Sequence, residues 1–245
     1  MINIGRVKKE HWLYHKKIAH RGYHNKEAPE NSMGAFENAI RKDYAIELDV
    51  RISKDNKIVV FHDKDLKRMC NVDLVVIENN YKDIKEFKLL ETEEGIPLLR
   101  DLLNVVAGRV PLMIEIKNEN EIGITESEVD KLLAEYKGEY VIQSFNPFSM
   151  RWFKKHNKNV IRGQISWRAK HERNLIIRFI KKHMLFNIYS KPDFINYEIE
   201  GLSSCPIKIR RLFKKPILGW TLRKKVEYDN VLKKCDNVVF EQFEL

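Results

Sequence analysis

Short apolar runs rich in β-branched residues recur along the whole chain, and patterns typical of amphipathic helices separate several of them. These runs predict eight strands, at Lys17–His20, Ala45–Val50, Pro111–Ile116, Tyr140–Phe145, Val160–Ile165, Asp193–Tyr197, Pro216–Thr221 and Asn237–Glu241. The helical patterns fall at Ser32–Lys42, Glu126–Tyr136, Pro147–His156, Arg173–Ile188 and Pro206–Phe213, with N-caps expected at Ser32 and Ser204. Eight strands alternating with helices in 245 residues predict an α/β fold, a (β/α)₈ TIM barrel, rather than an open doubly wound sheet.

One interval between strands is too long for a simple barrel connection. The segment Ile52–His62 predicts a hairpin that turns at Asp55-Asn56 and returns along Ile58–Phe61. The following segment, Asp63–Arg100, is polar and broken, and we expect it to form a small inserted lobe over the barrel mouth. The sequence has no Pro-, Gly- or Ser-rich linker. We therefore expect one domain over residues 1–245, with the insertion inside residues 52–110.

Composition places the chain among ordinary globular proteins, because 43% of residues are hydrophobic and 33% are charged. The three cysteines are an odd number and lie far apart, which argues against a disulfide framework and a cysteine zinc site. The N-terminus shows no apolar signal region, and no segment reaches the roughly 18 apolar residues of a membrane span. These features predict a soluble, cytoplasmic protein.

The charge is unevenly distributed along the chain. The formal net charge is +10, yet residues 151–225 contain 20 Lys and Arg against 4 Asp and Glu. This basic half indicates either an anionic partner or a solvated basic surface. The sequence shows no helix-turn-helix, zinc finger or aromatic platform, so it does not favour nucleic acid as the partner. A peripheral contact with an anionic membrane stays open, because one expected helix has an apolar face and a basic face. The apolar face carries Ile176, Phe179, Ile180 and Met184, and the basic face carries Arg178, Lys181 and Lys182. The same apolar face would also suit packing against a sheet.

Ionisable residues cluster at the carboxyl ends of the first predicted strands, where a barrel of this kind carries its catalytic groups. The first strand ends in His20-Arg21, and the hairpin return ends in His62. Period-two alternation places Glu47 and Asp49 on one face of their strand, and it places Glu115 and Lys117 on one face of theirs. The candidate set of site residues is therefore His20, Arg21, Glu47, Asp49, His62, Glu115 and Lys117.

This set of residues predicts a metal-assisted site. Three carboxylates buried together repel one another unless a cation lies among them, and an all-oxygen set favours Mg²⁺ or Ca²⁺ over Zn²⁺. His20 and His62 suit general acid and base, and Arg21 and Lys117 suit a phosphate that also contacts the metal. We assign no role to the remaining histidines: His11, His15, His24, His156, His171 and His183.

Several motifs together resemble the glycerophosphodiester phosphodiesterase family. They are IAHRGYHNKEAPEN at 18–31, AFENA at 35–39, ELDVRISKDNKIVVFHDKDLKR at 47–68, IEIK at 114–117, QSF at 143–145, GWTLR at 219–223 and the closing VVFE. The resemblance spans nearly the whole chain. It implies a barrel with an insertion after the second strand, catalysis by His20 and His62, a metal on Glu47, Asp49 and Glu115, and phosphate contacts from Arg21 and Lys117.

The resemblance also brings further positions and two departures. Glu30 and Asn31 match a P-E-N segment that lies beside the site in the family, and Trp220 lies in the GWTLR motif. Ser32 stands where Thr is usual, and Arg223 stands where Asn commonly follows W-T-x in the family.

Three functions follow as hypotheses. The first is hydrolysis of a small-molecule glycerophosphodiester to glycerol phosphate and an alcohol, by water or through a cyclic phosphate. The second is cleavage of lysophospholipid or sphingolipid headgroups at a membrane in the phospholipase D manner. A binding module without activity is disfavoured by the intact set of histidines and carboxylates. The sequence contains no signal for the headgroup or the oligomeric state.

Overall fold

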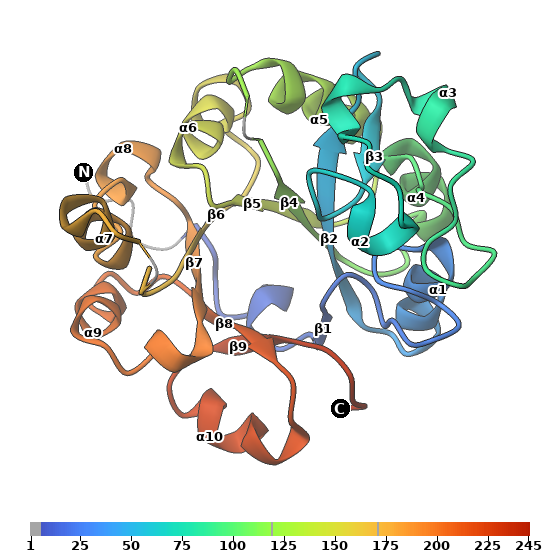
Figure 1. The fold of residues 1–245 in the computed structure, drawn as a ribbon. Coiled ribbons are helices and arrows are strands. Elements are labelled where there is room, and N and C mark those ends of the chain that lie inside the picture. Colours follow the sequence, from blue (N-terminus) through green and yellow to red (C-terminus); the bar gives the residue numbers. More distant parts are fainter. Residues whose placement is uncertain (1–5, 119, 171) are drawn as a thin grey trace. The chain divides into compact units, whose positions relative to one another are not determined.

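The computed structural model describes residues 6–118, 120–170 and 172–245 (Figure 1). Residues 1–5, which belong to the N-terminal segment read above as lacking an apolar signal region, lie outside the described residues, and so does His171. Contacts group the chain into two compact units, one of Ile18–Tyr140 and the other of Met1–Lys17 with Val141–Leu245. The prediction of one domain over residues 1–245 stays a prediction.

The Ile18–Tyr140 unit contains three parallel strands and the predicted hairpin. The strand β2 (Ala45–Ile52) pairs in parallel with β1 (Ile18–Ala19) and β4 (Leu112–Ile116), and its far end pairs antiparallel with β3 (Ile58–Val60). The hairpin turns at Asn56, whose φ of 59° lies in the left-handed region that Asn tolerates. Strand β2 therefore extends two residues beyond its predicted end.

Three longer helices accompany these strands. Helix α1 (Met33–Arg41) begins at Ser32, whose hydroxyl accepts from Ala35 N at 3.1 Å, as predicted for its N-cap. Helix α5 (Ile124–Ala134) lies two residues N-terminal of its predicted range. The sequence interpretation did not identify α4 (Leu99–Val106), which buries four apolar side chains and contacts α1 and β3. In Figure 1, α1 and α4 lie on the outer side of β2 and β3.

The insertion consists of short pieces: α2 (Lys67–Cys70), the 3₁₀ turn Val76–Glu78 and α3 (Tyr81–Ile84). Figure 1 shows this teal segment beside β2 and β3. The prediction that Asp63–Arg100 lacks long regular elements is confirmed, but the segment is not only polar. Apolar side chains from the insertion form a buried cluster on the hairpin strand: Val59, Phe61, Leu66, Met69, Val76, Ile84, Leu89 and Ile96. This core explains how a segment with little regular structure is held in place.

The second unit contains five parallel strands paired in sequence order: β5 (Tyr140–Ser144), β6 (Arg162–Ser166), β7 (Phe194–Glu198), β8 (Ile217–Leu222) and β9 (Asn237–Phe240). Together with the first unit, the described residues thus form eight parallel strands at the predicted places. Pro111 and Pro216 precede their strands because proline has no N–H to donate to a ladder.

The described part of this unit also contains five helices and three 3₁₀ turns. The helices are α6 (Pro147–His156), α7 (Leu175–Lys182), α8 (Asn187–Ser190), α9 (Cys205–Arg211) and α10 (Tyr228–Leu232). The turns are Trp12–Tyr14, Ile199–Gly201 and Lys225–Glu227. Helix α6 matches its predicted range, whereas α10 was not predicted. Over the described ranges, no helix is long and apolar enough to cross a membrane.

Two predictions in this unit need correction. The single helix expected over Arg173–Ile188 is two helices, because the buried Met184 adopts a left-handed φ of 51° that no helix interior accommodates. Ser204 does occupy the N-cap position of α9, but its side chain makes no capping hydrogen bond.

Candidate active site

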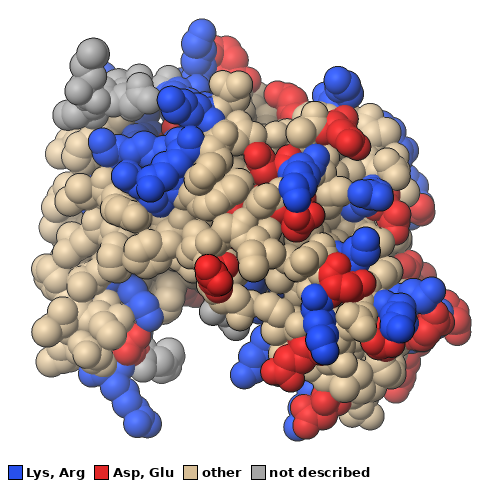
Figure 2. All heavy atoms as spheres, turned by 90° about the horizontal axis from the view of Figure 1, so that it is seen from above, with Lys and Arg blue, Asp and Glu red and all other residues tan. Residues whose placement is uncertain are grey.

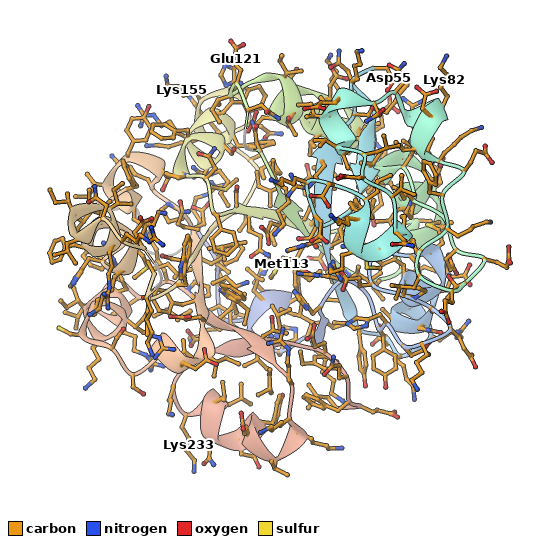
Figure 3. All side chains as sticks on the ribbon, in the orientation of Figure 1. Asp55, Lys82, Met113, Glu121, Lys155 and Lys233 are labelled. Carbon is orange, nitrogen blue, oxygen red and sulfur yellow. The ribbon has the colours of Figure 1, made fainter. Side chains whose placement is uncertain are left out.

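Three carboxylates from neighbouring strands meet at the carboxyl ends of β2 and β4. Glu47, Asp49 and Glu115 are all buried, and one oxygen from each lies within 4.8 Å of the others. The parallel register places Asp49 directly beside Glu115. Met113, labelled in Figure 3, lies two residues before Glu115 on the same face of β4. The predicted alternation is therefore what brings the three acids together.

Burial and mutual repulsion set the charge states of these acids. Burial raises the pKa of Glu47, and the charges of Asp49 and Glu115 raise it further. Burial likewise raises the pKa of Glu115 to about 7, although the Lys117 ammonium opposes the rise. Burial would also raise the pKa of Asp49, but the charges of Lys117 and Arg21 outweigh it and hold that pKa well below its usual range. The cluster therefore favours an added cation at neutral pH.

Lys117 directly follows β4 and lies among the acids, beside Glu115, with which it was predicted to share a face. Its Nζ lies 2.5 Å from Glu115 Oε1 and 3.2 Å from Asp49 Oδ1. Burial alone would lower the pKa of Lys117, but the charges of Asp49 and Glu115 raise it above its ordinary value. Lys117 therefore remains protonated and positive within the site.

Arg21 reaches the same acids from a tight turn after β1. Arg21 and Gly22 have φ of 53° and 80°, and a Cβ on Gly22 would lie 2.9 Å from the Ala35 backbone, so only glycine fits there. This turn directs Arg21 N to donate to Glu47 Oε2 at 3.0 Å. The guanidinium lies 2.6 Å from Glu30 and 3.3 Å from Asp49.

Asn31 holds Asp49 through two hydrogen bonds. Asn31 Nδ2 donates to Asp49 Oδ2 at 2.9 Å, and Asp49 N donates to Asn31 Oδ1 at 3.3 Å. Asn31 N also donates to Arg21 O at 2.9 Å, and its φ of 58° is left-handed. The P-E-N segment therefore contacts the candidate residues: Glu30 pairs with Arg21, and Asn31 holds Asp49.

The two predicted histidines lie in this unit with different surroundings. His20 Nε2 lies 4.0 Å from Glu47 Oε2, and its side chain is 12% exposed. The His62 side chain is 31% exposed, and its Nδ1 lies 2.6 Å from Asp63 Oδ1. Burial lowers the pKa of His62, Asp49 raises it, and the charges of Lys117 and Arg21 lower it again. The net direction is down, which favours neutral imidazole at physiological pH.

An ion-pair network behind His62 was not identified from sequence. Arg68, on α2, donates to Asp63 Oδ2 at 2.6 Å and to both oxygens of Glu30 at 2.6 and 3.1 Å. Asp63 thus joins His62 to Arg68, and Glu30 joins Arg68 to Arg21. The adjacent His-Asp pair was a signal for Asp63, but nothing in the sequence pattern indicated that the insertion supplies Arg68.

Trp220 and Arg223 lie in the other unit. Trp220 packs edge-on against Phe145, with ring centroids 5.5 Å apart. Arg223 Nε donates to Glu241 Oε1 at 2.6 Å, so the departure from the family's Asn introduces an ion pair. Among histidines without an assigned role, His11 Nδ1 accepts from Leu13 N, and the rings of His156 and His183 stack on Trp152 and Phe179.

Comparisons with known proteins agree with this geometry. The sequence model described as "Glycerophosphoryl diester phosphodiesterase family" matches residues 20–237. A glycerophosphodiester phosphodiesterase of Bacillus altitudinis is 31% identical over 178 residues, which are 67% of this chain and 72% of the relative. Lysophospholipase D GDPD1 of Rattus norvegicus is 32% identical over 147 residues, which are 55% of this chain and 45% of that protein.

Solved structures show the same fold. A glycerophosphoryl diester phosphodiesterase structure from Silicibacter pomeroyi covers 92% of this chain and 89% of its own, with a TM-score of 0.79 and 16% identity. A phosphodiesterase of Oleispira antarctica, in complex with the product sn-glycerol-3-phosphate, covers 92% of both chains, with a TM-score of 0.78 and 20% identity. These similarities confirm the predicted (β/α)₈ barrel.

Proposed function

Because this chain belongs to the glycerophosphoryl diester phosphodiesterase family, we propose that it hydrolyses glycerophosphodiesters to glycerol phosphate and an alcohol, with a divalent metal and two histidines. The family is one of hydrolases, so the chain is an enzyme. The observation that carries the proposal is the buried trio Glu47, Asp49 and Glu115 with His20 and His62 beside it. The product named with the Oleispira antarctica structure supports the glycerol phosphate half of the reaction.

The donor set fits a hard divalent ion. All three side chains offer carboxylate oxygens, the ligands that Mg²⁺ and Ca²⁺ prefer. Burial is the main cause of the raised pKa values of Glu47 and Glu115, and the neighbouring carboxylates raise them further, so a cation bound among these acids would favour their charged forms. A bound ion would supply positive charge both to these acids and to the substrate phosphate. We propose Mg²⁺ or Ca²⁺ as that ion.

Arg21 and Lys117 are the proposed phosphate contacts. Both are held as cations among the same acids, at 3.3 and 3.2 Å from Asp49. Their donors are therefore already placed beside the carboxylates when the substrate binds. Positive charge that is fixed in advance and directed at the phosphate stabilises the negative charge that develops during cleavage.

His20 and His62 are the proposed general acid and base. One removes a proton from the nucleophile, and the other donates a proton to the leaving alcohol oxygen. The nucleophile is water or the vicinal hydroxyl of the glycerol moiety, which would form a cyclic phosphate. Asp63 fixes the His62 ring through Nδ1, which leaves Nε2 to act on the substrate. Glu30 and Asn31 position Arg21 and Asp49 through hydrogen bonds, and Trp220 stays a predicted site residue.

A second candidate is cleavage of lysophospholipid or sphingolipid headgroups at a membrane, and the surface of α7 favours it. Over its described residues α7 buries no side chain, although the predicted apolar face suggested packing on the sheet. Ile176 and Phe179 are 72% and 55% exposed, with Lys182 on the same helix. Such a helix suits an anionic lipid surface. The similarity to lysophospholipase D GDPD1 supports the same candidate.

Vesicle binding tests this second candidate. Ile176→Ser with Phe179→Ser should weaken binding to anionic vesicles, while hydrolysis of water-soluble diesters should be retained. Ile124→Ser with Val226→Ser removes exposed apolar side chains elsewhere and serves as the matched control. Equal vesicle binding by both double variants and the wild type would contradict a membrane contact through α7. The soluble diesters would then be the remaining substrates.

A substrate panel tests the main proposal. Glycerophosphodiesters and lysophospholipids are incubated with the chain in chelator and with added Mg²⁺, Ca²⁺ or Zn²⁺, and phosphorus NMR identifies the products. We expect glycerol phosphate from the glycerophosphodiesters only after Mg²⁺ or Ca²⁺ is restored. Full turnover in chelator would contradict the metal assignment, and transient cyclic phosphate would identify the glycerol hydroxyl as the nucleophile.

A further inference from the structure

A cavity in the second unit lies at the amino ends of β6, β7 and β8, away from the strand ends that carry catalytic groups in barrels. Its volume is about 660 Å³, within the range of sites for small molecules. Five cations line it, from these strand ends and from helices α6, α8 and α9, together with one acid: Lys154, Arg162, Lys191, Arg210, Lys215 and Asp193. We call this the basic cavity.

Arg162 forms its buried base and is incompletely paired. Its side chain is 5% exposed, and its two terminal nitrogens donate to Ser190 O at 3.2 Å and Asp193 Oδ2 at 3.3 Å. Its Nε is buried and has no hydrogen-bond partner among the described residues. Asp193 Oδ2 is shared with a second arginine, Arg6, at 3.3 Å. One carboxylate therefore serves two guanidinium groups and leaves donor capacity unused.

The other cations add positive charge that this acid does not balance. Burial lowers the pKa of Lys215, Asp193 raises it, and the charges of Arg162 and Arg210 lower it further. Burial also lowers the pKa of Lys154, as do the neighbouring cations, Lys191 first among them. Like charges held this close destabilise one another unless an anion joins them. On the face drawn in Figure 2, one group of Lys and Arg has few acids between its members, whereas acids and bases are interspersed over other parts of that face.

We propose that the basic cavity binds a phosphate group, outside the catalytic set of residues. Five cationic side chains line a space large enough for a phosphate ester, and hydrogen bonds from cations to phosphate oxygens are among the strongest in proteins. The phosphate belongs either to a soluble ester or to a phospholipid headgroup. Exposed Ile188 and Phe213 also line the cavity, so acyl chains would meet apolar side chains beside it.

The test is calorimetric titration of inorganic phosphate into the full, chelator-treated chain. Lys154→Gln with Lys191→Gln removes two lining cations from half-buried and exposed positions. Its matched control, Lys155→Gln with Lys158→Gln, removes the same charge near the same helix end but outside the lining. We expect the cavity variant to bind phosphate roughly tenfold more weakly or worse, because each charge-assisted hydrogen bond accounts for about that factor. The control should stay within about twofold of the wild type.

Hydrogen exchange separates this binding from phosphate at the catalytic residues. Phosphate should protect residues 187–193 and 210–215, and the cavity variant should lose that protection while keeping its fold and its hydrolytic rate. Protection confined to residues 20–31 and 115–118, or equal phosphate affinity in both double variants, would overturn the proposal. Neither outcome would affect the proposed hydrolysis.

Vesicles distinguish the two sources of the phosphate. Phosphatidic acid vesicles are compared with phosphatidylcholine vesicles for the wild type and both double variants. Binding to phosphatidic acid that is lost only in the cavity variant identifies a lipid headgroup. Phosphate binding without such vesicle binding identifies a soluble phosphate ester.

Discussion

Asn31 and Asp49 exchange two hydrogen bonds, with Asn31 Nδ2 donating to Asp49 Oδ2 at 2.9 Å and Asp49 N donating to Asn31 Oδ1 at 3.3 Å. Asp49 Oδ1 lies 3.2 Å from Lys117. The carboxylate is thus held on both sides, and the left-handed backbone of Asn31 directs its amide into the site. Asn31 is therefore a positioning residue for the proposed metal ligand.

Asn31→Ala should weaken Mg²⁺ or Ca²⁺ binding by about 10- to 100-fold, because partners that orient metal ligands typically contribute that much. Calorimetric titration of the metal into the chelator-treated variant measures the effect. Asn104→Ala, at an exposed position of α4, is the control and should bind the metal like the wild type. Unchanged affinity in Asn31→Ala would show that Asp49 needs no such support.

Asp63→Asn should lower kcat, because the amide no longer offers His62 Nδ1 a carboxylate partner. The loss of that negative charge also removes an interaction that raises the pKa of His62, so this pKa should fall further. The pH profile of kcat would then shift to lower pH on the limb that belongs to His62. Asp73→Asn, an exposed acid in the same insertion, should leave both rate and profile unchanged. An identical profile in both variants would contradict the positioning role of Asp63.

Sequence reasoning identified the carboxylate cluster because alternation on a strand is a strictly local rule. Glu47 and Asp49 share a face by that rule alone, and the parallel register then adds Glu115. Arg68 could not be found in this way, since it reaches Glu30 and Asp63 through the fold of the insertion. That fold depends on a buried apolar cluster whose residues follow no regular period.

The helix expected over Arg173–Ile188 was wrong for a related reason. Its apolar period continues through Met184, and no Gly or Pro marks an interruption. The backbone nevertheless turns at Met184, which is buried, while Ile176 and Phe179 on the same predicted face are exposed. Tertiary packing therefore overrode the local helical preference.

The metal-free chain should lose thermal stability as pH rises from about 5 to about 7.5. The pKa of Glu115 is raised to about 7 in the folded chain, against about 4.3 when unfolded. Between these values the folded state binds more protons, so stability falls with rising pH and the contribution is lost above the folded pKa. The raised pKa of Glu47 acts in the same direction. The lowered pKa of His62 acts in the opposite direction below about pH 6.5, so the contribution of Glu115 is measured as the difference between the wild type and Glu115→Gln. The pKa of Asp49 is lowered, so its contribution to stability is complete above about pH 4 and is lost only at more acidic pH, outside this range.

Melting temperatures measured in chelator across this range check the prediction. Glu115→Gln carries no titrating group there and should show a shallower decline. Added Mg²⁺ or Ca²⁺ should reverse the trend, because deprotonated carboxylates bind the cation and metal affinity rises with pH. A wild-type melting temperature that changes with pH in chelator just as that of Glu115→Gln does would contradict the raised pKa of Glu115.

The central claim is that His20 and His62 carry out acid–base catalysis beside a metal held by Glu47, Asp49 and Glu115. The most direct measurement is kcat for a water-soluble glycerophosphodiester at saturating Mg²⁺ or Ca²⁺ in His20→Ala, His62→Ala and His183→Ala, with metal binding measured in each. We predict that the first two lower kcat by roughly 10²- to 10⁴-fold while still binding the metal. His183→Ala, whose ring stacks on Phe179 in the other unit, should keep the wild-type rate. Equal rates in all three variants would contradict the assignment.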